Sequence, residues 1–257
     1  MIIELFGPPG AGKTTFAHAL TNRLRECGHI VEPTLSCRPA ERLSSTGSRS
    51  SSPAQYRVAA VARRLIRPLL EMLSMAGHPL VLSHDIGAAA SLMRILPPRN
   101  MSAAIRLSQY ILRLSRSWYY ASASRHIVLF DQAFVQLIFS LAVLGREVDE
   151  SLIARAFESS PKADVLIRLD APQELRAARL QHRERQQGAI ERLFELDVTA
   201  NDASVRIIDQ LHDLLRNSGQ LVLHASSLDR RSLGESVDYI ERQLIVMFKG
   251  ERKAMAS

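Results

Sequence analysis

Residues 7–14 read Gly7-Pro8-Pro9-Gly10-Ala11-Gly12-Lys13-Thr14, which fits the pattern G-x-x-x-x-G-K-[ST] at every fixed position. A short, largely apolar stretch (residues 2–6) precedes them, and helix-forming residues follow from Thr15 onward. A strand, a glycine-rich turn and a helix in this order form the context in which the pattern binds phosphate groups. The stretch therefore predicts an α/β fold whose first strand leads into a phosphate-binding loop (P-loop).

The residue types in the loop explain its chemistry. Glycines let consecutive backbone N–H groups point at phosphate oxygens, and the start of the helix adds the positive end of its dipole. Lys13 is expected to reach the β- and γ-phosphates of a nucleoside triphosphate, and the Thr14 hydroxyl is expected to ligate Mg²⁺. We therefore predict ATP and Mg²⁺ as cofactors, bound by Gly7, Pro8, Pro9, Gly10, Ala11, Gly12, Lys13, Thr14 and Thr15.

The composition of the chain limits the classes of protein to which it can belong. With 257 residues, 46% hydrophobic and 23% charged, the chain fits a single globular domain over residues 1–257. No uninterrupted apolar run reaches 18 residues, so we expect no membrane span. The two cysteines lack metal-binding spacing, which favours reduced thiols and a cytoplasmic location. The net charge of +7 favours a cleft for several phosphates over nucleic acid, because few aromatic residues accompany the arginines.

Strand patterns alternate with helix patterns along the chain. Strands are predicted at residues 2–6, 29–32, 126–131, 165–170 and 221–224, with a further candidate at residues 80–83 that leaves the role of Asp85 open. Helices are predicted from Thr15 and at residues 56–75, 101–122, 134–144, 173–182, 200–217 and 233–247. The alternation predicts a three-layer P-loop NTPase fold: a parallel five-stranded sheet with helices on both faces. Residues 33–53 form a Ser/Arg-rich loop, and residues 249–257 are expected to be a loose tail.

Asp131 ends the buried strand at residues 126–131, so its carboxylate is expected at the sheet edge that carries the P-loop. Two functions fit such an acid: it can orient Mg²⁺ through water, or it can accept the proton of an attacking hydroxyl. The structural alternative is an N-cap for the helix that follows. We predict Asp131 as a catalytic residue and a metal ligand, alongside catalytic Lys13.

Arginines gather between residues 176 and 185. Arg176 and Arg179 share a helix face, while Arg183 and Arg185 fall where the helix gives way to a polar, arginine-rich lid at about residues 183–192. Phosphoryl transfer needs cations that cover the migrating group and exclude water. We predict catalytic roles for Arg183 and Arg185 and nucleotide contact for Arg179. Arg176 is expected on a solvated basic face, paired with nearby glutamates.

In this order of motifs the chain resembles the nucleoside and nucleoside-monophosphate kinases, thymidylate kinase most of all. Residues 7–15, 164–185 and 191–195 carry the likeness, which leaves the middle of the chain uncovered. The resemblance implies an ATP-dependent phosphotransferase with an arginine-rich lid. In thymidylate kinases an arginine follows the central acid and contacts the acceptor phosphate. Here Gln132 follows Asp131, so the acceptor site differs from that of the family.

The acceptor is expected between the Ser/Arg-rich loop and the helix at residues 101–122, on which Arg106, Arg113 and Arg116 share a face. Such arginines suit an anionic small molecule, with a homodimer as one option for the assembly. We predict an acceptor site that comprises Glu32, Arg38, Arg106, Arg113 and Gln132. The rival hypothesis is a P-loop ATPase that acts as a conformational switch without a small-molecule acceptor; no Asn-Lys-x-Asp guanine signature is present. A nucleic-acid-binding protein is a weaker third hypothesis.

Overall fold

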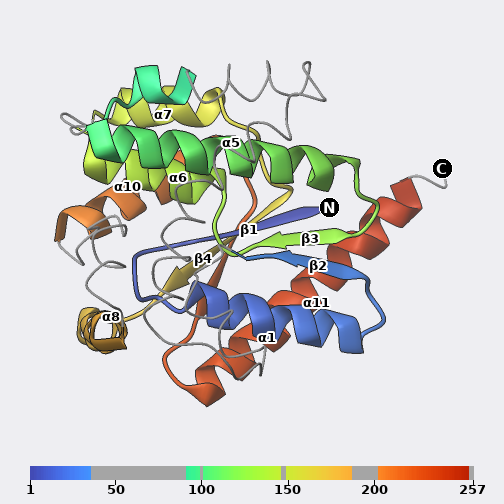
Figure 1. Ribbon diagram of the computed structural model, residues 1–257. Helices are drawn as coiled ribbons and strands as arrows, with labels where there is room; N and C mark the ends of the chain where they lie inside the picture. Colours follow the sequence, from blue (N-terminus) through green and yellow to red (C-terminus); the bar gives the residue numbers. More distant parts are fainter. Residues whose placement is uncertain (36–90, 99–100, 146–148, 187–201, 255–257) are drawn as a thin grey trace, which may run out of the picture.

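Five parallel strands form the central sheet of the computed structural model, which describes residues 1–35, 91–98, 101–145, 149–186 and 202–254. The strands are β1 (Ile2–Phe6), β2 (Val31–Thr34), β3 (Ile127–Phe130), β4 (Val165–Asp170) and β5 (Val222–Ser226), in the spatial order β2-β3-β1-β4-β5 (Figure 1). All four strand pairs are parallel. The predicted fold class, a five-stranded parallel sheet within an α/β domain, is confirmed.

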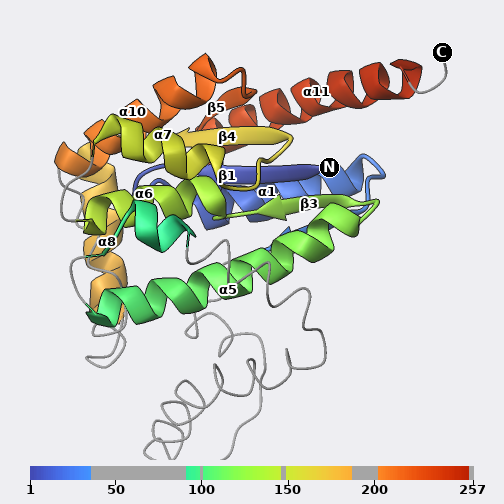
Figure 2. The same cartoon turned by 90° about the horizontal axis from the view of Figure 1, so that it is seen from above.

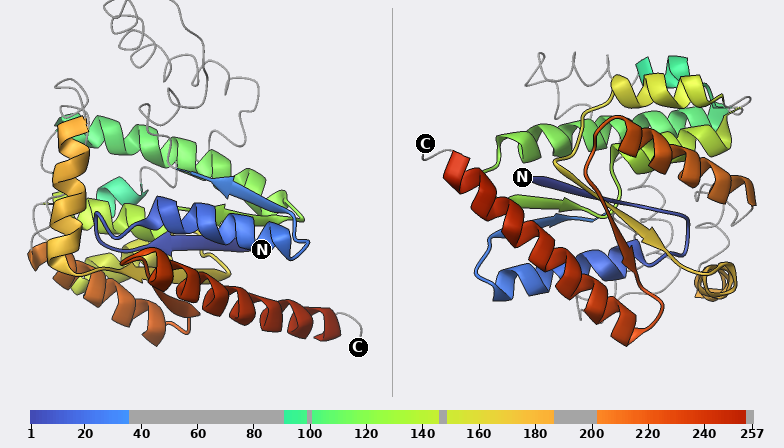
Figure 3. Two further views of the ribbon diagram at one scale, coloured as in Figure 1. Left: turned by 90° about the horizontal axis from the view of Figure 1, so that it is seen from below. Right: turned by 180° about the vertical axis from the view of Figure 1, so that it is seen from behind.

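Helices cover both faces of this sheet. On one face lie α1 (Lys13–Glu26) and α11 (Arg230–Ala254); on the other lie α5 (Met101–Ala123), α6 (Phe134–Leu144), α7 (Glu150–Glu158) and α10 (Asp202–Asn217), as Figure 2 shows. Helix α8 (Gln173–Gln186) lies beyond the carboxyl ends of the strands (Figure 3). Ligands of open parallel sheets bind at this edge, so α8 lies beside the place where a ligand is expected.

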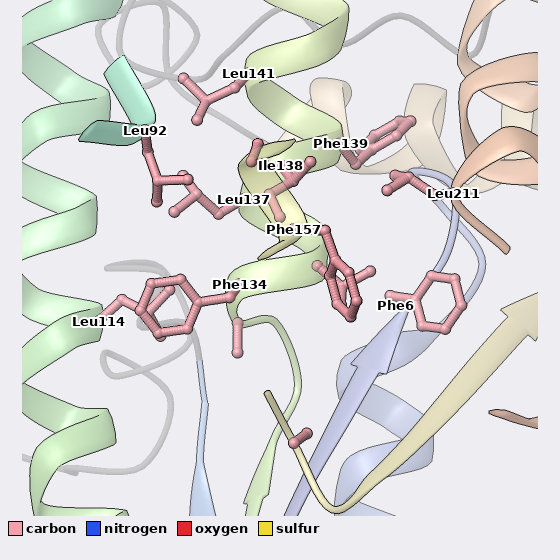
Figure 4. Packing of buried hydrophobic residues seen from close by; sticks show 14 of the residues in the cluster. Phe6, Leu92, Leu114, Phe134, Leu137, Ile138, Phe139, Leu141, Phe157 and Leu211 are labelled. Carbon is pink, nitrogen blue, oxygen red and sulfur yellow. The ribbon is translucent and has the colours of Figure 1, made fainter. Parts of the chain in front are cut away.

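Successive side chains of β1 point to opposite faces of the sheet, and the core is therefore divided into two clusters. Ile3 and Leu5 pack with α1 and α11, whereas Phe6 packs with α5, α6 and α10. Figure 4 shows the second cluster, in which Phe6 lies near Phe157 of α7 and Leu211 of α10. Because β1 is central and buried on both sides, its position in the sheet is strongly fixed. The loop that follows β1 therefore starts from a rigid strand.

Two predicted boundaries differ in the structure. Strand β2 runs over Val31–Thr34 rather than residues 29–32, and it includes Pro33, which was assigned to the loop. Proline is tolerated there because β2 is the edge strand of the sheet that the described residues form, and an edge strand has one row of N–H groups with no strand to bond. At the other end of the chain, α11 continues to Ala254, so most of the expected loose tail is helical. Residues 251–254 are Glu, Arg, Lys and Ala, which are strong helix formers.

Two helices differ from what the sequence predicts. Helix α7 was not predicted, although Ile153, Ala156 and Phe157 are buried at helical spacing. Helix α8 continues to Gln186, so the backbone of Arg183 and Arg185 belongs to the helix rather than to a polar loop. The helix expected at residues 56–75, the candidate strand at 80–83, Asp85 and the remainder of the Ser/Arg-rich loop lie outside the described residues. Within the described segments, no helix is both long enough and apolar enough to cross a bilayer.

Candidate phosphoryl-transfer site

The P-loop connects β1 to α1 and is packed tightly on both sides. Gly7 has φ 147° and Gly12 has φ 94°, values that side-chain-bearing residues rarely adopt. A Cβ atom on Gly7 would lie 2.2 Å from the Leu169 carbonyl oxygen, and one on Gly12 would lie 2.9 Å from Ser227 Oγ. Glycine is thus required at both positions by conformation and by space. The ends of β4 and β5 hold the loop in place.

Lys13 is the first residue of α1, and its side chain folds back onto the P-loop. Its Nζ donates hydrogen bonds to the carbonyl oxygens of Gly7 (2.8 Å) and Pro8 (3.1 Å). The side chain is buried, with 7% of the residue exposed. A buried ammonium group beside the loop at the amino end of a helix is suited to bind an anion.

Thr14 and Asp131 meet although they are 117 positions apart in the sequence. Thr14 Oγ1 donates to Asp131 Oδ2 at 2.9 Å, and Asp131 is completely buried. Parallel pairing of β1 with β3 produces this contact, because it brings the carboxyl ends of both strands together. The N-cap of α6 is Ala133, which makes no side-chain capping bond, so Asp131 is not the N-cap residue considered from the sequence.

This pair fits a magnesium ion. Mg²⁺ is commonly held by one or two protein oxygens, with phosphate oxygens and water completing its shell. Thr14 and Asp131 supply a hydroxyl and a carboxylate oxygen at hydrogen-bond distance. No group of three or more His, Cys, Asp or Glu side chains in the described segments could hold a metal ion by itself. A Mg²⁺ ion held by Thr14 and Asp131 would take its other ligands from water or phosphate oxygens.

Glu4 was missed by sequence reasoning. It lies in the middle of β1 with 1% of its surface exposed, and its Oε1 accepts N–H bonds from Ala133 (3.2 Å), Val135 (2.7 Å) and Gln136 (3.1 Å) at the start of α6. Its Oε2 is buried with no hydrogen-bond partner among the described residues. The signal was available: a glutamate inside a strand that is expected to be buried on both faces needs a polar partner.

Burial raises the pKa of Glu4 from 4.5 to about 8, against the opposing effect of the backbone N–H groups of Gln136, Val135 and Ala133. The carboxyl group is therefore largely protonated at neutral pH. Nearby Tyr110 has its phenol pKa raised by burial first and then by the charges of Glu4 and Asp131. Titratable groups of β1, β3 and α5 thus converge behind the P-loop.

The raised pKa of Glu4 predicts a pH-dependent stability. The folded protein binds the proton more tightly than the unfolded chain, so Glu4 favours folding at low pH and loses this contribution as pH rises between about 4.5 and about 8. The free energy of unfolding should fall in that window by at most about 1.4 kcal/mol per pH unit for this one group. Chemical denaturation of the wild type and of Glu4→Gln at several pH values measures this change in the free energy of unfolding. The variant should gain stability relative to the wild type as pH rises; parallel curves would contradict the assignment.

Gln136 ties α6 to the P-loop. Its Oε1 accepts the backbone N–H of Gly7 at 3.2 Å, and 6% of the residue is exposed. Its position inside the apolar run of α6 (residues 134–144) hid it from sequence reasoning. On the neighbouring helix, Tyr110 donates its hydroxyl to the carbonyl oxygen of Gln132 at 3.4 Å. The turn at residues 131–133 is therefore held from both α5 and β1.

Two arginines of α8 lie against the loop. Arg179 Nη1 donates to the Gly10 carbonyl oxygen (3.2 Å), while Nη2 donates to the carbonyl oxygens of Ser227 and Leu228. Arg179 thus joins the P-loop to the segment between β5 and α11. Arg176 is 4% exposed, and its Nε and Nη1 have no hydrogen-bond partner among the described residues. The solvated position expected for Arg176 is wrong, because its backbone packs directly on Gly10.

Replacing Arg179 by methionine should weaken ATP binding. Bonds from a charged guanidinium are worth about 1.5–3 kcal/mol, so loss of the link between the two loops should raise the dissociation constant about tenfold or more. Isothermal titration with an ATP analogue gives this value. Arg231→Met is the matched control, because Arg231 lies in the first turn of α11 with a side chain that is 89% exposed. Equal affinities of the two variants would show that Arg179 has no part in binding.

The other predicted site residues are distributed more widely. The Glu32 carboxylate lies 2.5 Å from His126 Nδ1, next to the amino end of β3. Arg113 is exposed on α5, where its charge acts on Tyr110. For Arg106, Arg183 and Arg185 only the helical backbone is described, and Arg38 lies outside the described residues. The structure therefore brings together Lys13, Thr14, Asp131 and Arg179 at the P-loop.

Known proteins offer limited similarity. No family model matches the chain, and no curated protein matches it in sequence. Among solved structures, it is similar to deoxyadenosine kinase from M. mycoides with the products dCMP and a flexible dCDP bound, at 13% identity and a TM-score of 0.49, covering 96% of this chain and 100% of that one. The same kinase with bound dATP matches at 14% identity and a TM-score of 0.44, covering 95% and 99%. At these values the likeness does not identify an acceptor for this chain.

Proposed function

We propose that this chain is an ATP- and Mg²⁺-dependent phosphotransferase that moves the γ-phosphoryl group to a small-molecule acceptor. The observation that carries the proposal is the 2.9 Å bond between Thr14 and Asp131 beside a P-loop whose Lys13 is already engaged with the loop carbonyls. This arrangement supports a site where phosphate groups and a divalent cation are held together. The basic side chain of Arg179 approaches the same loop from α8.

The donor side of the reaction can be assigned residue by residue. The backbone N–H groups of Gly10, Gly12, Lys13 and Thr14, together with the Lys13 ammonium group, would hold the phosphates, and Thr14 with Asp131 would hold Mg²⁺. When bound, Mg²⁺ neutralises charge that develops on the phosphate oxygens. The buried contact with Thr14 favours a metal-orienting function for Asp131 over that of a general base. Arg183 and Arg185 continue α8 beyond Arg179, and we propose that they cover the transferred group.

We place the acceptor beside the turn at residues 131–133 and the α5 face that carries Arg106, Tyr110 and Arg113. Tyr110 contacts this turn directly, and Arg113 lies one helical turn further along α5. Gln132 offers an amide that can donate and accept hydrogen bonds but cannot neutralise a phosphate. An anionic acceptor, nucleotide-like or otherwise phosphorylated, would then depend on the arginines of α5. Arg38 is the remaining proposed acceptor residue, whereas the Glu32 carboxylate is bonded to His126 at the amino end of β3, away from this turn.

A transfer assay tests the proposal. The protein is incubated with Mg²⁺ and γ-labelled ATP against a panel of nucleosides, nucleotides and sugar phosphates, and labelled products are separated. Label on any acceptor supports the phosphotransferase. Release of inorganic phosphate alone, at a rate that no acceptor changes, would sink this proposal in favour of an ATPase that acts as a conformational switch.

A further inference from the structure

Four hydrogen bonds join the two halves of the site. Glu4 Oε1 accepts the N–H groups of Ala133, Val135 and Gln136, and Gln136 Oε1 in turn accepts the N–H of Gly7. We call Glu4 and Gln136 together the β1–α6 bridge. One end of this bridge is the first residue of the P-loop. The other end is the turn at residues 131–133, which carries Asp131.

The energetics of Glu4 argue against a purely structural function. An Asp or Ser at position 133 could cap α6 for about 1 kcal/mol without burying a carboxyl group in the sheet. The chain instead has Ala133 there and caps the helix with a glutamate whose second oxygen, Oε2, is buried with no hydrogen-bond partner in the described part of the chain. An unpartnered buried polar atom costs about 1–3 kcal/mol. Such costs are commonly retained where function requires a fixed geometry.

The location of Glu4 explains which parts of the site its side chain can hold in position. In the sheet Glu4 pairs with Phe130, whose next residue is Asp131, and with Leu166 on the other side. Its backbone is therefore set by β3 and β4, and its side chain then sets the start of α6. The distance between Asp131 and Thr14 depends on the same turn.

We propose that Glu4 is a positioning residue that holds Asp131 at Thr14, and that the β1–α6 bridge couples nucleotide binding at the P-loop to the turn at residues 131–133. The inference rests on the proposed binding of Mg²⁺ and a nucleoside triphosphate at residues 7–14. It assigns no contact with substrate to Glu4. The bridge acts through Asp131 and Gly7 only.

The first test separates metal-dependent from metal-independent binding. Titration of a non-hydrolysable ATP analogue in Mg²⁺ and in EDTA should show that Glu4→Leu weakens binding about tenfold in Mg²⁺ and less than about twofold in EDTA, as loss of an outer-shell partner does. Glu4→Gln should retain both affinities, because its amide oxygen can accept the same N–H groups. Glu241→Leu is the control, since Glu241 is 7% exposed in α11 on the other face. An equal loss in both solutions, or none, would overturn the positioning function.

The second test uses Trp118, the single tryptophan of the chain. Its ring lies 5.2 Å from Phe130 and 5.2 Å from Phe134, the residues that flank the turn at 131–133. Nucleotide binding should change its emission in the wild type, and Gln136→Leu should abolish the change while binding persists by calorimetry. Ser140→Ala, which removes a bond to the Gln136 carbonyl within α6, should leave the change intact. The coupling would be overturned if nucleotide binding left the wild-type emission unchanged. It would also be overturned if Gln136→Leu showed the same change in emission as the wild type. Absence of any nucleotide binding by the wild type would instead overturn the proposed function and the inference with it.

Discussion

Replacing Lys13 by methionine is expected to reduce phosphoryl transfer about 10²–10³-fold, the usual loss when one charge-stabilising group of a preorganised site is removed. The Lys13 ammonium is buried and bonded to the carbonyl oxygens of Gly7 and Pro8, so it lies inside the loop before any phosphate arrives. Methionine has a similar length and no charge. Initial rates at saturating acceptor and ATP measure the effect in kcat.

The control for Lys13 is Arg25, a basic residue in the last turn of the same helix that donates to the Val31 carbonyl oxygen. Arg25→Met should lower stability slightly and leave the rate per folded molecule unchanged. If Lys13→Met retained more than about a tenth of the wild-type rate, the loop would not act as the phosphate site. A loss of the same size in Arg25→Met would point to general damage to α1.

Sequence reasoning could place the P-loop and Asp131 at one edge of the sheet because the signals for them are local or follow from strand ends. The spacing of residues 7–14 identifies a loop whose contacts lie within a few positions. The meeting of Thr14 with Asp131 follows from one further rule, that parallel strands end at a common edge. Both predictions use positions along strands that strong apolar patterns already define.

The residues that sequence reasoning missed are polar side chains inside apolar runs. Glu4 interrupts β1, and Gln136 interrupts α6; each is buried because its partner comes from a distant segment. Arg176 shows the reverse case, in which neighbouring glutamates suggested a solvated face although α8 packs that position on Gly10. No pattern along the chain encodes which helix face a loop will cover, since that depends on how α8 docks at the sheet edge.

The acceptor half was the least predictable part. Its proposed residues come from four segments of the sequence, and the structure pairs one of them, Glu32, with His126. Tyr110 was absent from the predicted set, yet it makes the contact between α5 and the turn at residues 131–133. Helical spacing placed Arg106 and Arg113 on one face of α5 but could not show what that face meets.

Replacing Asp131 by asparagine is expected to lower kcat about 10²-fold while ATP binding in the absence of Mg²⁺ is retained. Asparagine preserves the size of the side chain and one oxygen that can accept from Thr14 Oγ1, so the fold around the completely buried residue should survive. It removes the negative charge, and with it the preference for a divalent cation beside Thr14. Rates measured across a series of Mg²⁺ concentrations should show a raised requirement for the metal, about 10–100-fold.

The metal dependence distinguishes the two functions that Asp131 could have. A metal-orienting carboxylate predicts that high Mg²⁺ restores part of the lost rate in Asp131→Asn, and that the pH dependence of the remaining rate is unchanged. A general base predicts the opposite: no restoration by Mg²⁺, and a rate that rises with pH as hydroxide replaces the missing base. Thr14→Val supplies the matched comparison, because it removes the hydroxyl on the other side of the same 2.9 Å contact. If the contact marks the metal site, both variants should shift the Mg²⁺ requirement in the same direction; a shift in only one of them would separate Asp131 from the metal and return it to the acceptor.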